Sequence, residues 1–183
     1  MKLLKLTKLN ETNLKNAFKK GDKSVIQINM DGSVGTELIP GKIKNIFTHD
    51  LCGCSACAIL ARCKNGNPFL IMTHFPPDRN SVHAQEIRRI LKQNEIFIDT
   101  NKPASLLFST PKSRLSNDIE EKDLFEQINL TAKKFFNNNI ESKALPYTNE
   151  GDCRVFVINI PKNKGDDITY SALGNHSGNF GVL

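Results

Sequence analysis

One short segment of this chain brings together the residue types of a nucleophilic catalyst. Cys54 follows a glycine, Thr48 stands six residues before it, and His74 lies twenty residues after it. Nucleophilic attack on an acyl carbon needs a thiol, an imidazole that takes its proton, and a third group that orients the imidazole. The spacing therefore predicts an enzyme that attacks amides, with Cys54, His74 and Thr48 as candidate catalytic residues.

A predicted β-hairpin would position the thiol and the imidazole. Residues 54–63 are apolar on both alternating faces, which predicts a central strand buried on both sides. The Lys-Asn-Gly-Asn sequence at 64–67 is a strong turn signal, and residues 69–74 would form the return strand. His74 is therefore expected at the end of the return strand, near the start of the first strand.

The length of the hairpin loop decides which cysteine faces the histidine. A two-residue loop would pair Cys57 with His74. A three-residue loop with Gly66 in the left-handed conformation would pair Ala56 with His74, and Cys54 would then lie diagonal to it on the same face, roughly 7–8 Å away. Local sequence leaves both cysteines possible. We predict the longer loop, with Gly66 at positive φ, which places Cys54 and His74 on one face.

Three points favour Cys54 as the nucleophile. It follows Gly53, where the backbone can turn sharply and expose an amide N–H beside the sulfur. It starts its strand, next to an edge where substrate can enter, and its neighbour Ala56 leaves room beside the histidine. Cys57 lies inside the apolar run and is expected to be an inert buried thiol.

Other interpretations of the same residues have to be weighed. Four cysteines at 52, 54, 57 and 63 could be drawn with His74 as a zinc site, but their spacing matches no standard zinc ribbon or finger. An extended strand would also point Cys54 and Cys57 to opposite faces. His49 and Asp50 could serve as base and orienter, although such a loop pair is more often solvent-exposed. Ordinary core packing beside a buried histidine is the plainest alternative.

Composition predicts one catalytic domain over residues 1–183, long enough to bury a sizeable core. The net charge of +6 comes from scattered lysines and fits a solvated basic surface; an acidic protein partner ranks second and nucleic acid third. Five cysteines, four of them crowded together, favour reduced thiols over a disulfide framework. No apolar run is long enough to span a bilayer, and residues 1–8 lack the apolar stretch of a Sec signal peptide.

The mixture of hairpins and separated helices favours an α+β fold, in particular a single-domain α/β sandwich with a mixed, largely antiparallel sheet and flanking helices. The tail after residue 162 is rich in glycine and polar residues and is expected to be loop. Helices are expected from a cap at 10–12 through 18, from a cap at 81 to about 93, and from a cap at Asn117 through 135. The last has Leu124, Ile128, Ala132 and Phe135 at helical spacing, which predicts its buried stripe. The remaining strands are expected at 24–29, 42–47, 104–109, 144–148 and 154–160.

The segment Leu51-Cys52-Gly53-Cys54 resembles the Leu-Ser-Gly-Cys motif of bacterial toxin deamidases of the Burkholderia lethal factor and cytotoxic necrotizing factor type. The chemoreceptor glutamine deamidase CheD is similar in arrangement. In that group a threonine commonly stands six residues before the catalytic cysteine and a histidine ends the following strand, which Thr48, Cys54 and His74 match. The resemblance covers residues 42–77. This chain departs from it in having Cys52 in place of the serine and a longer interval from cysteine to histidine.

The resemblance implies an α/β sandwich that converts glutamine to glutamate in a protein substrate, without a metal or cofactor. It implies a bacterial toxin or effector, made in the bacterial cytoplasm and delivered to the host cytoplasm, where a host protein would be the substrate. We expect a monomer. The alternatives are a papain-like cysteine protease or transglutaminase, a zinc-stabilised binding module, and a basic adaptor without catalysis.

Overall fold

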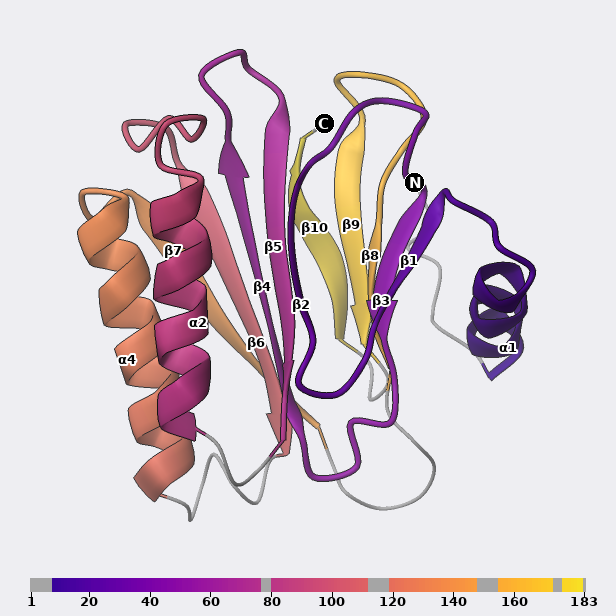
Figure 1. Cartoon of the computed structure of the whole chain (residues 1–183), viewed down its shortest axis with the longest axis horizontal. Helices are drawn as coiled ribbons and strands as arrows, with labels where there is room; N and C mark the ends of the chain where they lie inside the picture. The colour runs from indigo at the N-terminus through magenta and orange to yellow at the C-terminus, as the bar shows by residue number, and fades with distance from the viewer. Residues whose placement is uncertain (1–7, 77–79, 112–118, 148–154, 173–175, 183) are drawn as a thin grey trace.

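The chain folds into four layers, which Figure 1 shows side by side. The structure is a computed structural model that describes residues 8–76, 80–111, 119–147, 155–172 and 176–182. Two sheets pack face to face; one helix covers the outer face of the first sheet, and two helices cover the outer face of the second. The expected α+β sandwich with flanking helices is confirmed.

The first sheet has the strand order β1-β3-β8-β9-β10, in which only β1 and β3 run parallel among the described strands. Its strands are β1 (Val25–Ile28), β3 (Asn45–Thr48), β8 (Phe156–Asn159), β9 (Asp167–Ala172) and β10 (His176–Val182). Helix α1 (Lys8–Lys19) packs on its outer face, where Leu14 and Ala17 meet a cluster that contains Val25, Phe47 and Val157.

The second sheet has the order β2-β5-β4-β6-β7, and β6 and β7 form its one parallel pair among the described strands. Its strands are β2 (Ser33–Glu37), β5 (Pro68–Phe75), β4 (Ser55–Arg62), β6 (Ala104–Pro111) and β7 (Ile140–Tyr147). Helices α2 (Asn80–Gln93) and α4 (Ile119–Phe135) lie against its outer face. None of the helices in the described ranges is both long and apolar enough to cross a membrane.

Strand β4 is buried on both faces, as its apolar run predicts. Ala56, Ala58 and Leu60 face the core between the two sheets, whereas Cys57 and Ile59 face the helices. This is the alternation expected of a strand, in which successive side chains point to opposite faces. It places Cys54 with the residues between the sheets.

The β4–β5 hairpin closes through the three-residue loop Lys64-Asn65-Gly66. The amide of Cys63 donates to the carbonyl of Asn67 at 2.7 Å, and Gly66 has φ of +87°. The resulting register pairs Ala56 with His74. The expectation of a loop longer than two residues, with Gly66 at positive φ, is confirmed.

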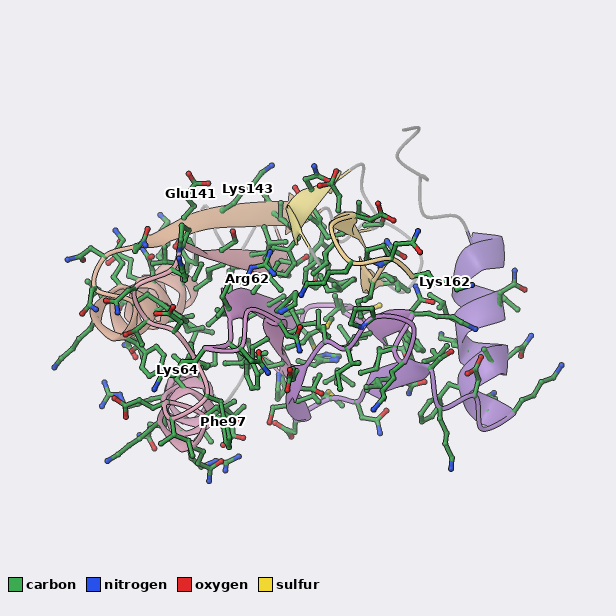
Figure 2. The ribbon with its side chains drawn as sticks, turned by 90° about the horizontal axis from the view of Figure 1, so that it is seen from above. Arg62, Lys64, Phe97, Glu141, Lys143 and Lys162 are labelled. Carbon is green, nitrogen blue, oxygen red and sulfur yellow. The ribbon has the colours of Figure 1, made fainter. Side chains whose placement is uncertain are left out.

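Figure 2 looks down on the layers from the end that carries this loop, where Arg62 and Lys64 are in view. The opposite end holds the start of β4 and the finish of β5. The same end holds the finish of β1 and of β3, which run parallel, because Thr48 at the end of β3 contacts His74 near the end of β5.

The expectation that the tail after residue 162 is loop is wrong. It forms β9 and β10, which complete the first sheet. Glycine in β10 permits close approach: a Cβ at Gly181 would lie 2.5 Å from a methyl of Leu60 in the other sheet, and one at Gly178 would lie 2.9 Å from the Tyr170 hydroxyl. Gly178 and Gly181, which suggested a loop, are therefore packing positions within a strand.

Smaller differences concern one additional strand and the ends of two helices. Strand β2 was not expected; it is short and contains Gly35, where a Cβ would lie 2.8 Å from a methyl of Ile90 on α2. After Ala132 the next buried side chain is that of Phe136, directly after α4, rather than that of the expected Phe135, which is partly buried. Helix α1 begins at Lys8, before its expected cap. The expected cap at Asn117 lies outside the described residues.

Candidate functional site

Four strand ends meet at the end of the sandwich opposite the hairpin loop, the lower end in Figure 1. Thr48 is the last residue of β3, Ile28 is the last of β1, and His74 is the last but one of β5. Cys54 directly precedes β4. The side chains of Thr48, His74 and Cys54 are all buried, with exposed fractions of 0%, 1% and 5%.

Thr48 holds the imidazole of His74 in one tautomer. Its hydroxyl oxygen lies 2.7 Å from His74 Nδ1 and also donates to the carbonyl of Ile28 at 2.7 Å. A hydroxyl has one proton, and a carbonyl can only accept. Since that proton goes to Ile28, the contact with the ring requires that Nδ1 carry a hydrogen and donate it to Thr48. The expected contact between Thr48 and the ring is confirmed.

This tautomer leaves Nε2 of the neutral ring with its lone pair, which is the state a general base needs. The backbone of His74 is also fixed, because its amide donates to the carbonyl of Gly32 at 3.0 Å. Gly32 belongs to the turn after β1, and its amide donates to the carbonyl of Asn29 at 2.8 Å. The β1 end therefore holds both the ring, through Ile28 and Thr48, and the strand that carries it.

Cys54 lies on the same face as His74. Ala56 is the direct partner of His74 across the β4–β5 pair, and Cys54 is two residues before Ala56 and shares its face. Diagonal neighbours of this kind stand roughly 7–8 Å apart at the backbone, so side chains that lean together can meet. The register thus gives Cys54, rather than Cys57, the position beside the imidazole.

Cys57 lies on the other face of the strand, among residues that pack against the helices. It is 1% exposed, and burial raises the pKa of its thiol well above the ordinary value of 9.0. The thiol form is therefore the stable one in the folded protein, and a thiol is a poor nucleophile. Cys57 faces away from His74 and keeps its thiol proton, so we assign it a packing role.

Replacing Cys57 by alanine is expected to flatten the loss of stability at high pH. Above pH about 9 the unfolded chain releases the thiol proton while the folded chain keeps it, so stability falls by up to about 1.4 kcal/mol per pH unit. The Cys57→Ala variant loses this contribution, which urea unfolding between neutral pH and pH about 10 would measure. Parallel pH profiles for wild type and variant would contradict the assignment of Cys57 as a buried neutral thiol.

A tight turn carries the motif from β3 to β4. Asp50 has φ of +60° and Gly53 has φ of +88°, a backbone region that side chains other than glycine, asparagine and aspartate rarely adopt. The hydroxyl of Tyr147, at the end of β7, donates to the carbonyl of Leu51 and lies 2.5 Å from the carbonyl of Cys54. Tyr147 is thus a positioning residue that the sequence did not reveal, since it lies 93 residues from Cys54.

Replacement of Tyr147 by phenylalanine is expected to lower the free energy of unfolding by about 1–3 kcal/mol, because buried carbonyls of the motif turn lose a hydrogen-bond donor. Tyr170→Phe is a matched control, because these are the only two tyrosines and both are 2% exposed. The Lys143 amine donates to the Tyr170 hydroxyl at 3.1 Å, and this hydrogen bond is only partly buried. In Tyr170→Phe the amine can therefore bond to water instead, so the loss of stability should be smaller. Urea unfolding of both variants measures the difference, and equal losses would contradict a special role for Tyr147.

His49 and Asp50 do not join this site. His49 Nδ1 lies 2.5 Å from a carboxylate oxygen of Asp50, and its ring stacks on Phe47 at 6.1 Å. Phe47 faces α1 on the outer side of the first sheet, whereas Thr48 faces the core between the sheets. Lys15 of α1 lies 3.9 Å from Asp50. The pair therefore lies on the outer side of the first sheet, where Asp50 contacts helix α1.

A metal centre finds no support in the part of the chain that the structure describes, where no three His, Cys, Asp or Glu side chains are grouped to hold an ion. Cys54 and Cys57 face opposite sides of the sheet, Cys52 is exposed, and Cys63 pairs with Ile98 at the other end of β4. Cys153 lies outside the described residues. A single ion could not take Cys54 and Cys57 together.

Comparisons with protein-family models and with curated proteins give no match to this chain.

Proposed function

We propose that this protein is a cysteine-dependent protein-glutamine deamidase, which converts a glutamine side chain of a protein substrate to glutamate and releases ammonia. The observation that carries the proposal is the buried contact of Thr48 with His74 Nδ1, on the strand face that Cys54 shares. It supplies an oriented base beside a thiol. The resemblance of residues 51–54 to the deamidase motif supports the choice of reaction.

In the first half-reaction, His74 Nε2 takes the proton of the Cys54 thiol, and the thiolate sulfur attacks the carboxamide carbon of glutamine. The carbonyl oxygen takes on negative charge, which backbone N–H groups, including that of Cys54, stabilise. When the tetrahedral species collapses, the carbon–nitrogen bond breaks. His74 returns its proton to the leaving nitrogen, so that ammonia departs and a thioester remains.

In the second half-reaction, His74 takes a proton from water, and the resulting hydroxide attacks the thioester carbon. The carbon–sulfur bond breaks, glutamate is formed, and the proton returns to the sulfur of Cys54. Thr48 takes no part in the covalent steps. It keeps Nδ1 protonated through the cycle, so that Nε2 alone gains and loses the proton.

The burial of the site favours a side-chain amide over a peptide bond as the substrate. With Cys54 only 5% exposed and His74 1% exposed, the reacting group must enter by a narrow approach. The amide of glutamine stands at the end of two methylene groups and can reach a recessed thiol. Proteolysis would require a whole peptide backbone to lie beside the sulfur. We propose that the substrate is a host protein and that the chain acts as a bacterial toxin or effector.

Mass spectrometry of host-cell extracts incubated with the protein tests this proposal. A glutamine that becomes glutamate, in the presence of the wild type and not of Cys54→Ser, is the expected result. A primary amine added to the same incubation separates the alternatives, because a transglutaminase would attach the amine and a protease would cut the chain. Attachment or cleavage in place of deamidation would overturn the proposed reaction.

A further inference from the structure

The motif turn carries a second thiol beside the candidate nucleophile. Cys52 is exposed and reduced, and Cys54 is buried two residues later. The serine of the deamidase motif is replaced here by this exposed thiol. The sequence Cys-Gly-Cys thus joins a thiol that solvent reaches to a thiol beside an imidazole, and no step of the proposed reaction uses the first.

The two cysteines stand two residues apart in a bent segment, a spacing that a disulfide can span. One hydroxyl, that of Tyr147, reaches the carbonyls of both Leu51 and Cys54, so the segment closes on itself. The chain bends at Cys52 and Gly53. Two steps of about 3.8 Å joined at a bend bring the outer Cα atoms within about 5–7 Å. A disulfide usually joins Cα atoms about 4.4–6.8 Å apart.

The residue between the two cysteines allows their side chains to rotate toward each other. Gly53 already has φ of +88°, and a Cβ built there would meet no atom within 4 Å. The space around Gly53 is therefore open, and glycine adopts a wide range of backbone conformations. The other described cysteines cannot be the disulfide partner of Cys54, because Cys57 faces the helices and Cys63 lies at the far end of β4.

We propose that Cys52 and Cys54 form a modification site: hydrogen peroxide oxidises the pair to an intramolecular disulfide, which blocks the nucleophile, and a dithiol reductant restores it. This inference rests on the proposed function for its consequence, the loss of deamidation, but the disulfide itself can be observed without any substrate. Cys52 is then a resolving cysteine, which protects Cys54 from further oxidation.

The oxidation balances in two steps. The thiolate of Cys54 attacks one oxygen of hydrogen peroxide, the oxygen–oxygen bond breaks, and the leaving hydroxide takes the proton held by His74 and departs as water. The sulfur loses two electrons and becomes a sulfenic acid. The sulfur of Cys52 then attacks the sulfur of Cys54; the sulfur–oxygen bond breaks, and the hydroxide leaves as a second water with the thiol proton of Cys52.

Reduction reverses the change. A dithiol such as dithiothreitol attacks one sulfur of the pair, passes through a mixed disulfide, and leaves as its own cyclic disulfide, with both thiols restored. One sulfur of the pair, that of Cys52, is exposed to solvent, and exposed disulfides are more easily reduced than buried structural ones. The oxidised state is therefore expected to be reversible rather than a permanent structural bond.

Peptide mapping after peroxide treatment tests the pairing. Trypsin releases the peptide 45–62, which contains Cys52, Cys54 and Cys57. In wild type and in Cys57→Ala, this peptide should lose two hydrogens and two alkylatable thiols, and dithiothreitol should restore both. In Cys52→Ser the peptide should gain oxygen atoms instead, and prolonged treatment should make that gain irreversible. No disulfide in the wild type, or an unchanged disulfide in Cys52→Ser, would overturn the proposal.

Activity of the reduced proteins separates this inference from the proposed function. Reduced Cys52→Ser carries the serine of the motif and should deamidate as the wild type does, but prolonged peroxide treatment should inactivate it without recovery. A protein that forms the disulfide yet never deamidates would refute the function alone. An active deamidase whose Cys52 and Cys54 never pair would refute the switch alone.

Discussion

Replacing Cys54 by alanine or serine should abolish deamidation, with a rate loss of about 10⁴-fold or more, because the reaction then has no nucleophile. The fold should persist. Cys54 is small, so its replacement by alanine should cost about 1 kcal/mol in the free energy of unfolding. Rates of glutamate formation and urea unfolding curves of the same preparations measure both quantities.

Cys57→Ala is the matched control, since it removes a buried thiol from the opposite face of the same strand. It should retain the wild-type rate. Activity that survives in the Cys54 variants and disappears in Cys57→Ala would show that the assignment of the nucleophile is reversed.

Loss of His74 should be nearly as damaging as loss of the thiol, because the same imidazole activates the sulfur, protonates the ammonia and activates the water. Members of one catalytic unit are not additive. The His74→Ala and Cys54→Ala double variant should therefore be no slower than Cys54→Ala alone. A His74→Ala protein that keeps a tenth or more of the wild-type rate, by comparison of rates at saturating substrate, would exclude this histidine as the base.

Thr48 provides a graded check on the same prediction. Thr48→Val keeps the shape and removes the hydroxyl that links His74 to Ile28. Groups that orient a catalytic residue through a hydrogen bond typically change activity by about 10–100-fold, which is smaller than the effect expected for His74. Thr48→Ser retains the hydroxyl and should restore most of the rate, whereas a purely steric role would leave valine better than serine.

Much of the site could be predicted from the sequence because local signals determine the hairpin. The Asn-Gly pair marks the turn, although it fits either loop length. The loop length sets the register, and the period of two along β4 then separates Cys54 from Cys57. Each of these steps uses residues that are neighbours in the chain. The same locality explains why the buried stripe of α4 at Leu124, Ile128 and Ala132 was predicted correctly.

The rest depends on contacts between distant segments. The hydroxyl of Tyr147 meets the motif turn across 93 residues, and the carbonyl of Ile28 meets Thr48 across 20. Backbone carbonyls and single hydroxyls leave no pattern in a sequence, so neither partner could be identified. The last two strands were missed for a related reason: Gly181 suits a close approach to the other sheet, but a glycine in isolation is typical of a loop.

The most direct test of the central claim is deamidation in water enriched in oxygen-18. If Cys54 forms a thioester that water hydrolyses, each glutamate made from glutamine by the wild-type protein acquires one heavy oxygen, which mass spectrometry locates in the substrate peptide. The Cys54→Ser protein should produce no such glutamate in the same mixture. Glutamate that forms equally with both proteins, or no labelled glutamate with either, would contradict the account.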